Sequence, residues 1–211
     1  MKHENVYRYG EGLPFKGQAR FTPAIEIDEL NWPMQYPSRP FARVKIGYDA
    51  ARLFLSFDVK EDLFRANVQE DNGRVWEDSC VEFFFQPGGD GGYYNLECNA
   101  IGTLLLAHGH DRHGREQAPP WALAAITRQA PVQVRRQEGK ALYCWSLALA
   151  IPFTSFFRHR LSPRPGDTAR ANFYKCGDKL PVPHFLSWNP VRSASPDFHR
   201  PVDFGILSFQ P

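Results

Sequence analysis

The chain has 211 residues, of which 43% are hydrophobic and 23% are charged, and its formal net charge is +2 at pH 7. This length suits one large domain and does not require a second. Acidic and basic residues are interspersed without the basic stripe that binds a phosphate backbone, so nucleic acid is excluded as an expected partner. No run approaches the roughly 20 apolar residues that cross a bilayer, so we also expect no membrane partner.

Aromatic residues make up 14% of the chain, and 18 residues are proline. Aromatic side chains favour half-buried strands, whereas proline interrupts helices and central strands. The composition therefore predicts many short strands joined by irregular loops. Residues 1–7 lack the apolar segment of a secretory signal, which leaves the location unknown, with a cytoplasmic one favoured over a periplasmic or secreted one.

Residues 1–40 are punctuated by proline and weakly periodic, and we expect an irregular lead-in that packs on the domain. Apolar and polar residues then alternate over residues 41–48 and again over 53–59, on either side of a turn at 49–52. This period of two predicts a hairpin with one buried face.

The same alternation predicts further strands downstream. Cys80 to Phe85 forms one of them, and the glycine-rich run at 87–92 is the strongest turn signal in the chain. The remaining predicted strands cover residues 93–98, 103–107, 132–136, 141–149, 169–175 and 206–209. Only the stretch from Thr154 to His159 predicts a short helix, which Pro163 ends.

About nine or ten short strands without the spacing of βαβ units predict an all-β fold, an antiparallel β-sandwich or jelly roll, as one domain over residues 1–211. The four cysteines lie inside strand-like runs and form no CxxC pair. In a chain long enough to build its own core, we expect buried free thiols, with one cross-strand disulfide as the alternative. They are Cys80, Cys98, Cys144 and Cys176.

The stretch from Trp76 to Phe85 carries the strongest indication of function. Alternation places Glu82 on the same strand face as Cys80 and Phe84. A carboxylate in so apolar a strand is costly to bury unless it is paired, hydrogen-bonded or open to a cleft. The residues alone leave two interpretations of Glu82, a carboxylate satisfied by a neighbouring arginine or part of a binding site.

The order of six motifs along the chain resembles family 9 carbohydrate-binding modules and their stand-alone relatives, within the DOMON-like β-sandwich superfamily. Each motif alone is weak, but six in this order are specific. They are the hairpin at 42–57, Trp-x-Asp-x-x-Val-Glu at 76–82, a strand entering Asn-x-x-Gly at 94–102, Ala-Ile-Pro-Phe at 150–153, a Pro-Gly-Asp turn before Asn-Phe at 165–173, and Phe-His-x-Pro-x-x-Phe-Gly at 198–205.

The resemblance implies a non-catalytic module that binds a mono- or oligosaccharide between two aromatic rings with polar groups beside them. A pyranose stacks its apolar face on a ring, and its hydroxyls need fixed donors and acceptors. By motif position, Trp76 is one ring and Glu82 is the carboxylate that accepts hydroxyl hydrogen bonds. The second ring falls at Phe198, where better-studied members carry the larger tryptophan, and Trp188 is the alternative source of that ring.

Four more residues are expected around the same site. Glu97 lies on a strand that we expect to pair with the strand of Glu82, and Asn99 follows it. His199 either hydrogen-bonds a hydroxyl or fixes the terminal loop. Arg112 (or Arg115) reaches towards the ligand from a loop.

Metal-binding residue types occur at 108–113 as His-x-His-Asp-x-His. This spacing can bind zinc or copper, but it lacks a helical or CxxC framework, so an exposed loop is the favoured interpretation. Members of the family that the chain resembles can carry structural calcium, yet no compact Asp/Asn/Gly calcium loop is evident. We therefore expect no cofactor and leave structural calcium open.

Two other functions stay open from sequence. A glycoside hydrolase would use Glu82 with Glu97 or Asp78 as a carboxylate pair flanking a cleft. A haem or redox domain of the same sandwich class would need a well-placed Met or His pair, and neither Met1 nor Met34 lies in a patterned strand. The resemblance favours binding without catalysis, with glycan-degrading enzymes as candidate partners.

Overall fold

The computed structural model describes residues 1–8, 23–88, 91–137 and 139–211. These residues form a strand-rich sandwich, which confirms the predicted all-β class. One α-helix is present in them, α1 (Pro120–Ala124), with three single turns of 3-10 helix, η1 (Val75–Glu77), η2 (Phe153–Ser155) and η3 (Pro201–Asp203).

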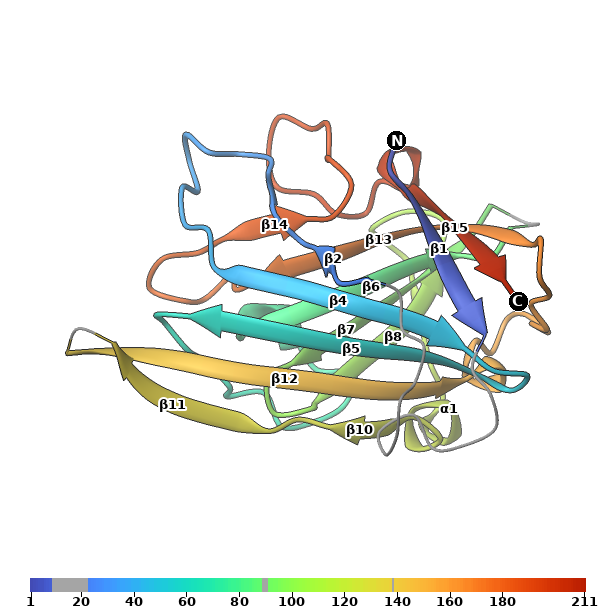
Figure 1. Cartoon of the computed structure of the whole chain (residues 1–211), viewed down its shortest axis with the longest axis horizontal. Helices are drawn as coiled ribbons and strands as arrows, with labels where there is room; N and C mark the ends of the chain where they lie inside the picture. Colours follow the sequence, from blue (N-terminus) through green and yellow to red (C-terminus); the bar gives the residue numbers. More distant parts are fainter. Residues whose placement is uncertain (9–22, 89–90, 138) are drawn as a thin grey trace.

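The strands form two layers that face each other. One contains β4 (Phe41–Tyr48), β5 (Arg52–Glu61) and β12 (Lys140–Pro152), extended by β2 (Ile25–Glu26), β10 (Thr127–Gln129) and β11 (Val132–Gln137). The other contains, in order, β15 (Gly205–Gln210), β13 (Thr168–Cys176), β6 (Cys80–Gln86), β7 (Tyr93–Asn99), β8 (Leu104–Gly109) and β9 (Glu116–Gln117). At the end of β13, β14 (Phe185–Ser187) pairs with it and with β3 (Glu29–Leu30). In Figure 1 the strands β4, β5 and β12 lie in front of β6, β7 and β8.

The two layers are joined by β1 (His3–Arg8), which pairs in parallel with both β15 and β4. The other pairings between described strands are antiparallel, so the predicted antiparallel sandwich is mixed at this one strand. β1 belongs to the stretch predicted to be an irregular lead-in. Only Val6 of its six residues is buried, which leaves no alternation to detect. Residues 9–22 of that predicted lead-in lie outside the described part of the chain.

The predicted hairpin is confirmed by β4 and β5, in which Val44 pairs with Phe57. The Asp49 carboxylate fixes the turn between them, because its Oδ1 accepts hydrogen bonds from the backbone N–H groups of Ala51 and Arg52, both at 2.7 Å. Phe57 is buried against Phe173 of the opposite layer, with 6.4 Å between ring centroids. Aromatic contacts of this kind fix the two layers relative to each other, and the packed layers support the outer face of β6 and β7.

The described residues contain fifteen strands, more than the nine or ten expected. The additional ones include β2, β3, β9, β10 and β14, each of two or three residues. Segments so short cannot display an alternating pattern, and they exist because neighbouring strands provide hydrogen-bonding partners.

The helix predicted from Thr154 to His159 is wrong. That stretch contains only the 3-10 turn η2, because Phe153 and Phe156 are both buried in the core and hold the chain against it. The α-helix lies at α1 instead, where Pro120 occupies the first turn and its fixed φ favours helix initiation. No helix in the described ranges is long and apolar enough to span a membrane.

Ser155 connects η2 to α1, because its buried hydroxyl donates a hydrogen bond to the carbonyl oxygen of Ala122 at 2.9 Å. Ser155→Ala should lower the free energy of unfolding by about 1–3 kcal/mol, since a buried carbonyl loses its partner. Urea unfolding followed by tryptophan fluorescence measures this change. A midpoint equal to that of the wild type would contradict the assigned role.

All four cysteines are free thiols. Cys80, Cys98 and Cys176 are buried as predicted, but Cys144 is only half-buried. It lies on β12 beside Trp145, which is buried in the core, so alternation places the Cys144 side chain on the outer face of the layer.

Candidate functional site

A pocket of about 380 Å³ lies on the outer face of β6, β7 and β8, opposite the sandwich core. Alternation produces this location, because Val81, Phe83 and Phe85 are in the core while Glu82 and Phe84 lie on the other face. The pocket is lined by Arg74, Trp76, Glu82, Phe84, Asn95, Glu97, Leu105, Ala107, Arg112, Arg115, Gln117, Asp178, Phe185, Pro196, Asp197, Phe198 and His199.

Two carboxylates, Glu82 and Glu97, lie directly opposite each other on β6 and β7 and are 3% and 4% exposed. Glu82 Oε1 accepts a hydrogen bond from the Cys176 thiol at 3.0 Å, so its partner is a thiol and not an arginine. Glu97 Oε1 accepts one from Asn95 Nδ2 at 2.8 Å. Glu97 Oε2 is buried and has no hydrogen-bond partner among the described residues.

Three carboxyl groups of the pocket, those of Glu97, Glu82 and Asp178, have raised pKa values. Burial raises the pKa of Glu97 to about 7, although the hydrogen bond from Asn95 opposes the shift. Burial and the neighbouring charge of Glu97 raise the pKa of Glu82 well above its ordinary value. Burial also raises the pKa of Asp178 to about 6, against the opposing effect of Arg112. Near neutral pH these groups can donate as well as accept hydrogen bonds.

Aromatic rings form part of the pocket wall. Trp76 is half-buried on η1, where the Arg74 guanidinium lies 5.7 Å from its ring centroid. Phe198 is 8% exposed and its ring stacks on Tyr174, with 4.0 Å between centroids and 13° between planes. One face of Phe198 is therefore covered by protein. Phe185 from β14 is 6.2 Å from Phe198 and adds a ring that the sequence analysis did not identify.

Two predicted site residues are not at this pocket. Trp188 is 2% exposed in the sandwich core against Phe173, and Gly205 packs directly on its indole, where a Cβ would approach to 2.6 Å. Asn99 is fully buried and holds loops together. Its amide donates to Val68 O at 2.8 Å and to Asp78 Oδ2 at 3.0 Å.

The other predicted polar residues, Arg112 and His199, do line the pocket. Arg112 is exposed, 3.7 Å from the Asp197 carboxylate. His199 Nδ1 is hydrogen-bonded to the Tyr93 hydroxyl at 2.9 Å, which ties the terminal loop to β7. Burial and the Arg115 charge lower the pKa of His199 to about 3, so its imidazole is neutral near pH 7.

Arg115 is the more firmly held arginine. Its Nε donates to Asn95 Oδ1 at 2.8 Å, and its guanidinium lies 4.2 Å from the centroid of Tyr93. Asn95 was not among the predicted site residues, although it precedes Glu97 by two positions and therefore shares its strand face. Asp178 and Asp197 also line the pocket, from loops without a sequence pattern.

Metal ligands are sparse in the described part of the chain. The side chains at 108–113 do not form a group of three donors, and Asp111 instead accepts a hydrogen bond from the backbone N–H of His113 at 2.7 Å. Three donors do gather at Cys80, Glu82 and Cys176. Two sulfurs do not fit calcium, which takes oxygen ligands. Met1 and Met34 are both exposed, away from the pocket.

Comparison with known proteins places this geometry in a family. The chain is 37% identical to a presumed carbohydrate-binding protein from Bacteroides uniformis ATCC 8492, with a TM-score of 0.87 and 99% of each chain covered. It also resembles a family 9 carbohydrate-binding module from Caldicellulosiruptor kristjanssonii. Against the cellotriose complex the identity is 10%, the TM-score 0.60 and the coverage 99% and 94%. Against the glucose complex these values are 12%, 0.58, 99% and 96%.

At these low identities the Caldicellulosiruptor structures support the fold alone. No curated protein matches the chain. The family model for carbohydrate-binding family 9 matches residues 17–209, which is most of the sequence. The chain therefore belongs to carbohydrate-binding family 9.

Proposed function

We propose that the chain binds a mono- or oligosaccharide in the pocket on β6, β7 and β8. The observation that carries the proposal is Glu97 Oε2, a buried carboxylate oxygen without a hydrogen-bond partner in the described chain. An unpaired buried acceptor is costly, and a ligand hydroxyl would satisfy it. Family membership and the glucose and cellotriose bound by the Caldicellulosiruptor module agree with a sugar as that ligand.

Rings and hydrogen-bonding groups occur together in the pocket, as saccharide recognition requires. Trp76 and Phe198 offer apolar surface for a pyranose face, although stacking on Tyr174 leaves only part of Phe198 available. Glu82 and Glu97 offer acceptors for hydroxyl groups. Arg115, held by Asn95, offers a donor in a fixed position. The pocket volume of about 380 Å³ lies within the range of small-molecule sites.

Binding without catalysis is part of the proposal. Glu82 and Glu97 are directly opposite on adjacent strands, so both project from the same floor of the pocket. A glycosidase needs its two carboxyl groups on either side of the scissile bond. Incubation with chromogenic glycosides should yield no turnover, and turnover that Glu82→Gln removes would contradict this part of the proposal.

Calorimetric titration with glucose and cellotriose tests binding directly. Trp76→Ala should weaken the affinity by about 30-fold or more, because central aromatic contacts contribute at least about 2 kcal/mol. The matched control is Trp121→Ala, which removes an exposed tryptophan on α1 that does not line the pocket. Its affinity should equal that of the wild type.

Two outcomes would contradict the pocket assignment. One is wild-type protein that binds neither sugar at millimolar concentration. The other is equal affinity in the wild type and in Trp76→Ala. Circular dichroism of each variant checks that the fold is retained.

A further inference from the structure

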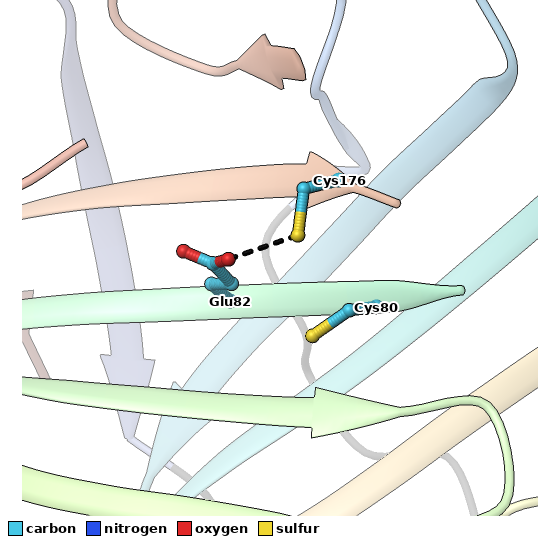
Figure 2. Close-up of side chains that lie close together, drawn as sticks. All are labelled: Cys80, Glu82 and Cys176. Carbon is cyan, nitrogen blue, oxygen red and sulfur yellow. Dashed lines mark hydrogen bonds between the residues drawn. The ribbon is translucent and has the colours of Figure 1, made fainter. Parts of the chain in front are cut away.

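Cys80, Cys176 and Glu82 gather their side chains at one end of the pocket floor. Cys80 begins β6 and Cys176 ends β13, and the two residues pair directly across the antiparallel strands. Glu82 follows Cys80 by two residues and therefore lies on the same face. The two sulfurs and one carboxylate oxygen all lie within 4.8 Å of one another, and Figure 2 shows them converging from the two strands.

This donor set has a definite metal preference. Thiolates select thiophilic cations, and two thiolates with one further ligand form a typical three-ligand zinc site that keeps a fourth position open. Without a metal, a hydrogen bond links two members of the cluster, because the Cys176 thiol donates to Glu82 Oε1 at 3.0 Å. Burial raises the pKa of the Cys80 thiol to about 11, so a cation strong enough to displace the thiol protons is required.

The surroundings provide access and charge compensation. Glu82 lines the pocket, so the cluster lies directly beneath a solvent-accessible surface. Glu97 and Asp178 are two further carboxyl groups of the pocket, and they offset the positive charge of Arg74, Arg112 and Arg115 in its lining. All three ligand residues are buried and lie on β6 and β13, which are central strands of the layer, so little ordering is needed on binding.

We propose that Cys80, Cys176 and Glu82 bind one zinc ion at the floor of the pocket, with the fourth coordination position open to water or to a ligand hydroxyl. Binding forms two sulfur–zinc bonds and one oxygen–zinc bond, and it releases to solvent the two thiol protons and any proton that the Glu82 carboxyl holds. This site stands on the three donors alone and does not depend on the pocket binding a sugar.

The test is a titration of reduced, chelator-treated protein with Co²⁺, which reports thiolate coordination by charge-transfer absorption in the near ultraviolet. One equivalent should saturate the band, and Zn²⁺ should abolish it while Ca²⁺ should not. Cys80→Ser and Cys176→Ser should remove the band. Glu82→Gln should weaken Co²⁺ binding by more than about tenfold, because loss of even an outer-shell partner costs about 10- to 100-fold.

Cys144→Ser is the matched control, because Cys144 is a half-buried thiol on the opposite layer. It should retain the full band. Circular dichroism and thermal melting of each variant show whether the fold is preserved. Zn²⁺ should raise the melting temperature of the wild type and of Cys144→Ser, but not of Cys176→Ser.

No cobalt band in folded, reduced wild-type protein would overturn the proposal. So would a band that persists in both Cys80→Ser and Cys176→Ser. Calorimetry with glucose and cellotriose on the same chelator-treated protein reports sugar binding separately, so failure of one proposal is distinguishable from failure of the other.

Discussion

Lys175→Met is expected to lower the free energy of unfolding by about 3–5 kcal/mol, the usual cost of leaving one member of a buried ion pair alone. Lys175 is fully buried, and its ammonium lies 2.9 Å from Glu61 Oε2 across the two layers. It also donates to His184 Nε2 at 2.8 Å and to Cys176 O at 2.9 Å. Each of its three protons thus has an acceptor, and methionine replaces none of them.

The environment of Glu61, the ion-pair partner of Lys175, explains why the expected loss of stability is large. Trp145 Nε1 donates to Glu61 Oε1 at 2.7 Å, but without Lys175 the carboxylate would be buried with no cation. Burial and the Lys175 charge lower the pKa of His184 to about 2, so in the wild type that imidazole is neutral and accepts the hydrogen bond from Lys175.

Urea unfolding of four variants, Lys175→Met, Glu61→Gln, their combination and a control, distinguishes this account from a simple packing defect. Lys175→Met combined with Glu61→Gln should recover part of the lost stability, because the second change removes the stranded charge. Lys140→Met, at an exposed lysine, should stay within about 0.5 kcal/mol of the wild type. A double variant as unstable as the sum of its single changes would contradict the ion-pair explanation.

Glu97→Gln is expected to stabilise the protein at pH 8 by an amount on the order of 3 kcal/mol. The pKa of Glu97 is raised to about 7 from an ordinary value of 4.5, so the folded state holds a proton that the unfolded state loses first. Wild-type stability therefore falls as the pH rises from about 4.5 to about 7 and is then constant with respect to this group. Glutamine resembles the protonated acid in shape and cannot lose a proton.

The measurement is the difference in unfolding free energy between the wild type and Glu97→Gln in metal-free buffer at several pH values. The difference should be small near pH 4.5 and should grow towards pH 7. Contributions from groups that do not interact with Glu97 cancel in this difference, whereas Glu82, whose pKa burial and the Glu97 charge raise, contributes to it. Glu26→Gln, at an exposed glutamate, should give no such slope. A difference independent of pH would contradict the raised pKa of Glu97.

A Glu97→Gln protein that is more stable than the wild type but binds sugar more weakly would explain why the Glu97 carboxylate is present. Functional sites commonly retain groups that lower the stability of the fold. Glu97→Gln should therefore weaken sugar binding by about tenfold or more, because it replaces a charged acceptor by a neutral one.

The strands and their buried faces were predictable where alternation is long. The period of two from Cys80 onwards was enough to place Glu82 on the strand face opposite Val81, Phe83 and Phe85. The glycine-rich turn at 87–92 predicted the return strand of Glu97, which does pair with that of Glu82. The same rule would have found Asn95, which shares the face of Glu97. Alternation is a local property of the chain, so it reports side-chain direction without knowledge of the tertiary fold.

Residues that reach the pocket from loops were less predictable. Asp178 and Asp197 approach it through turns that no local pattern specifies. Trp188 follows β14, and sequence proximity could not reveal that its indole is buried under Gly205 in the core. The motif position of Phe198 led to the pocket wall, but the stacking of its ring on Tyr174 depends on a contact between a loop and β13 that no local pattern specifies.

A crystal structure of the protein soaked with cellotriose tests the central claim most directly. The proposal predicts a sugar ring in the pocket on β6, β7 and β8, in contact with the Trp76 indole and with a hydroxyl within hydrogen-bonding distance of Glu97 Oε2. A sugar bound at another surface, with the Trp76 pocket filled only by water, would contradict it.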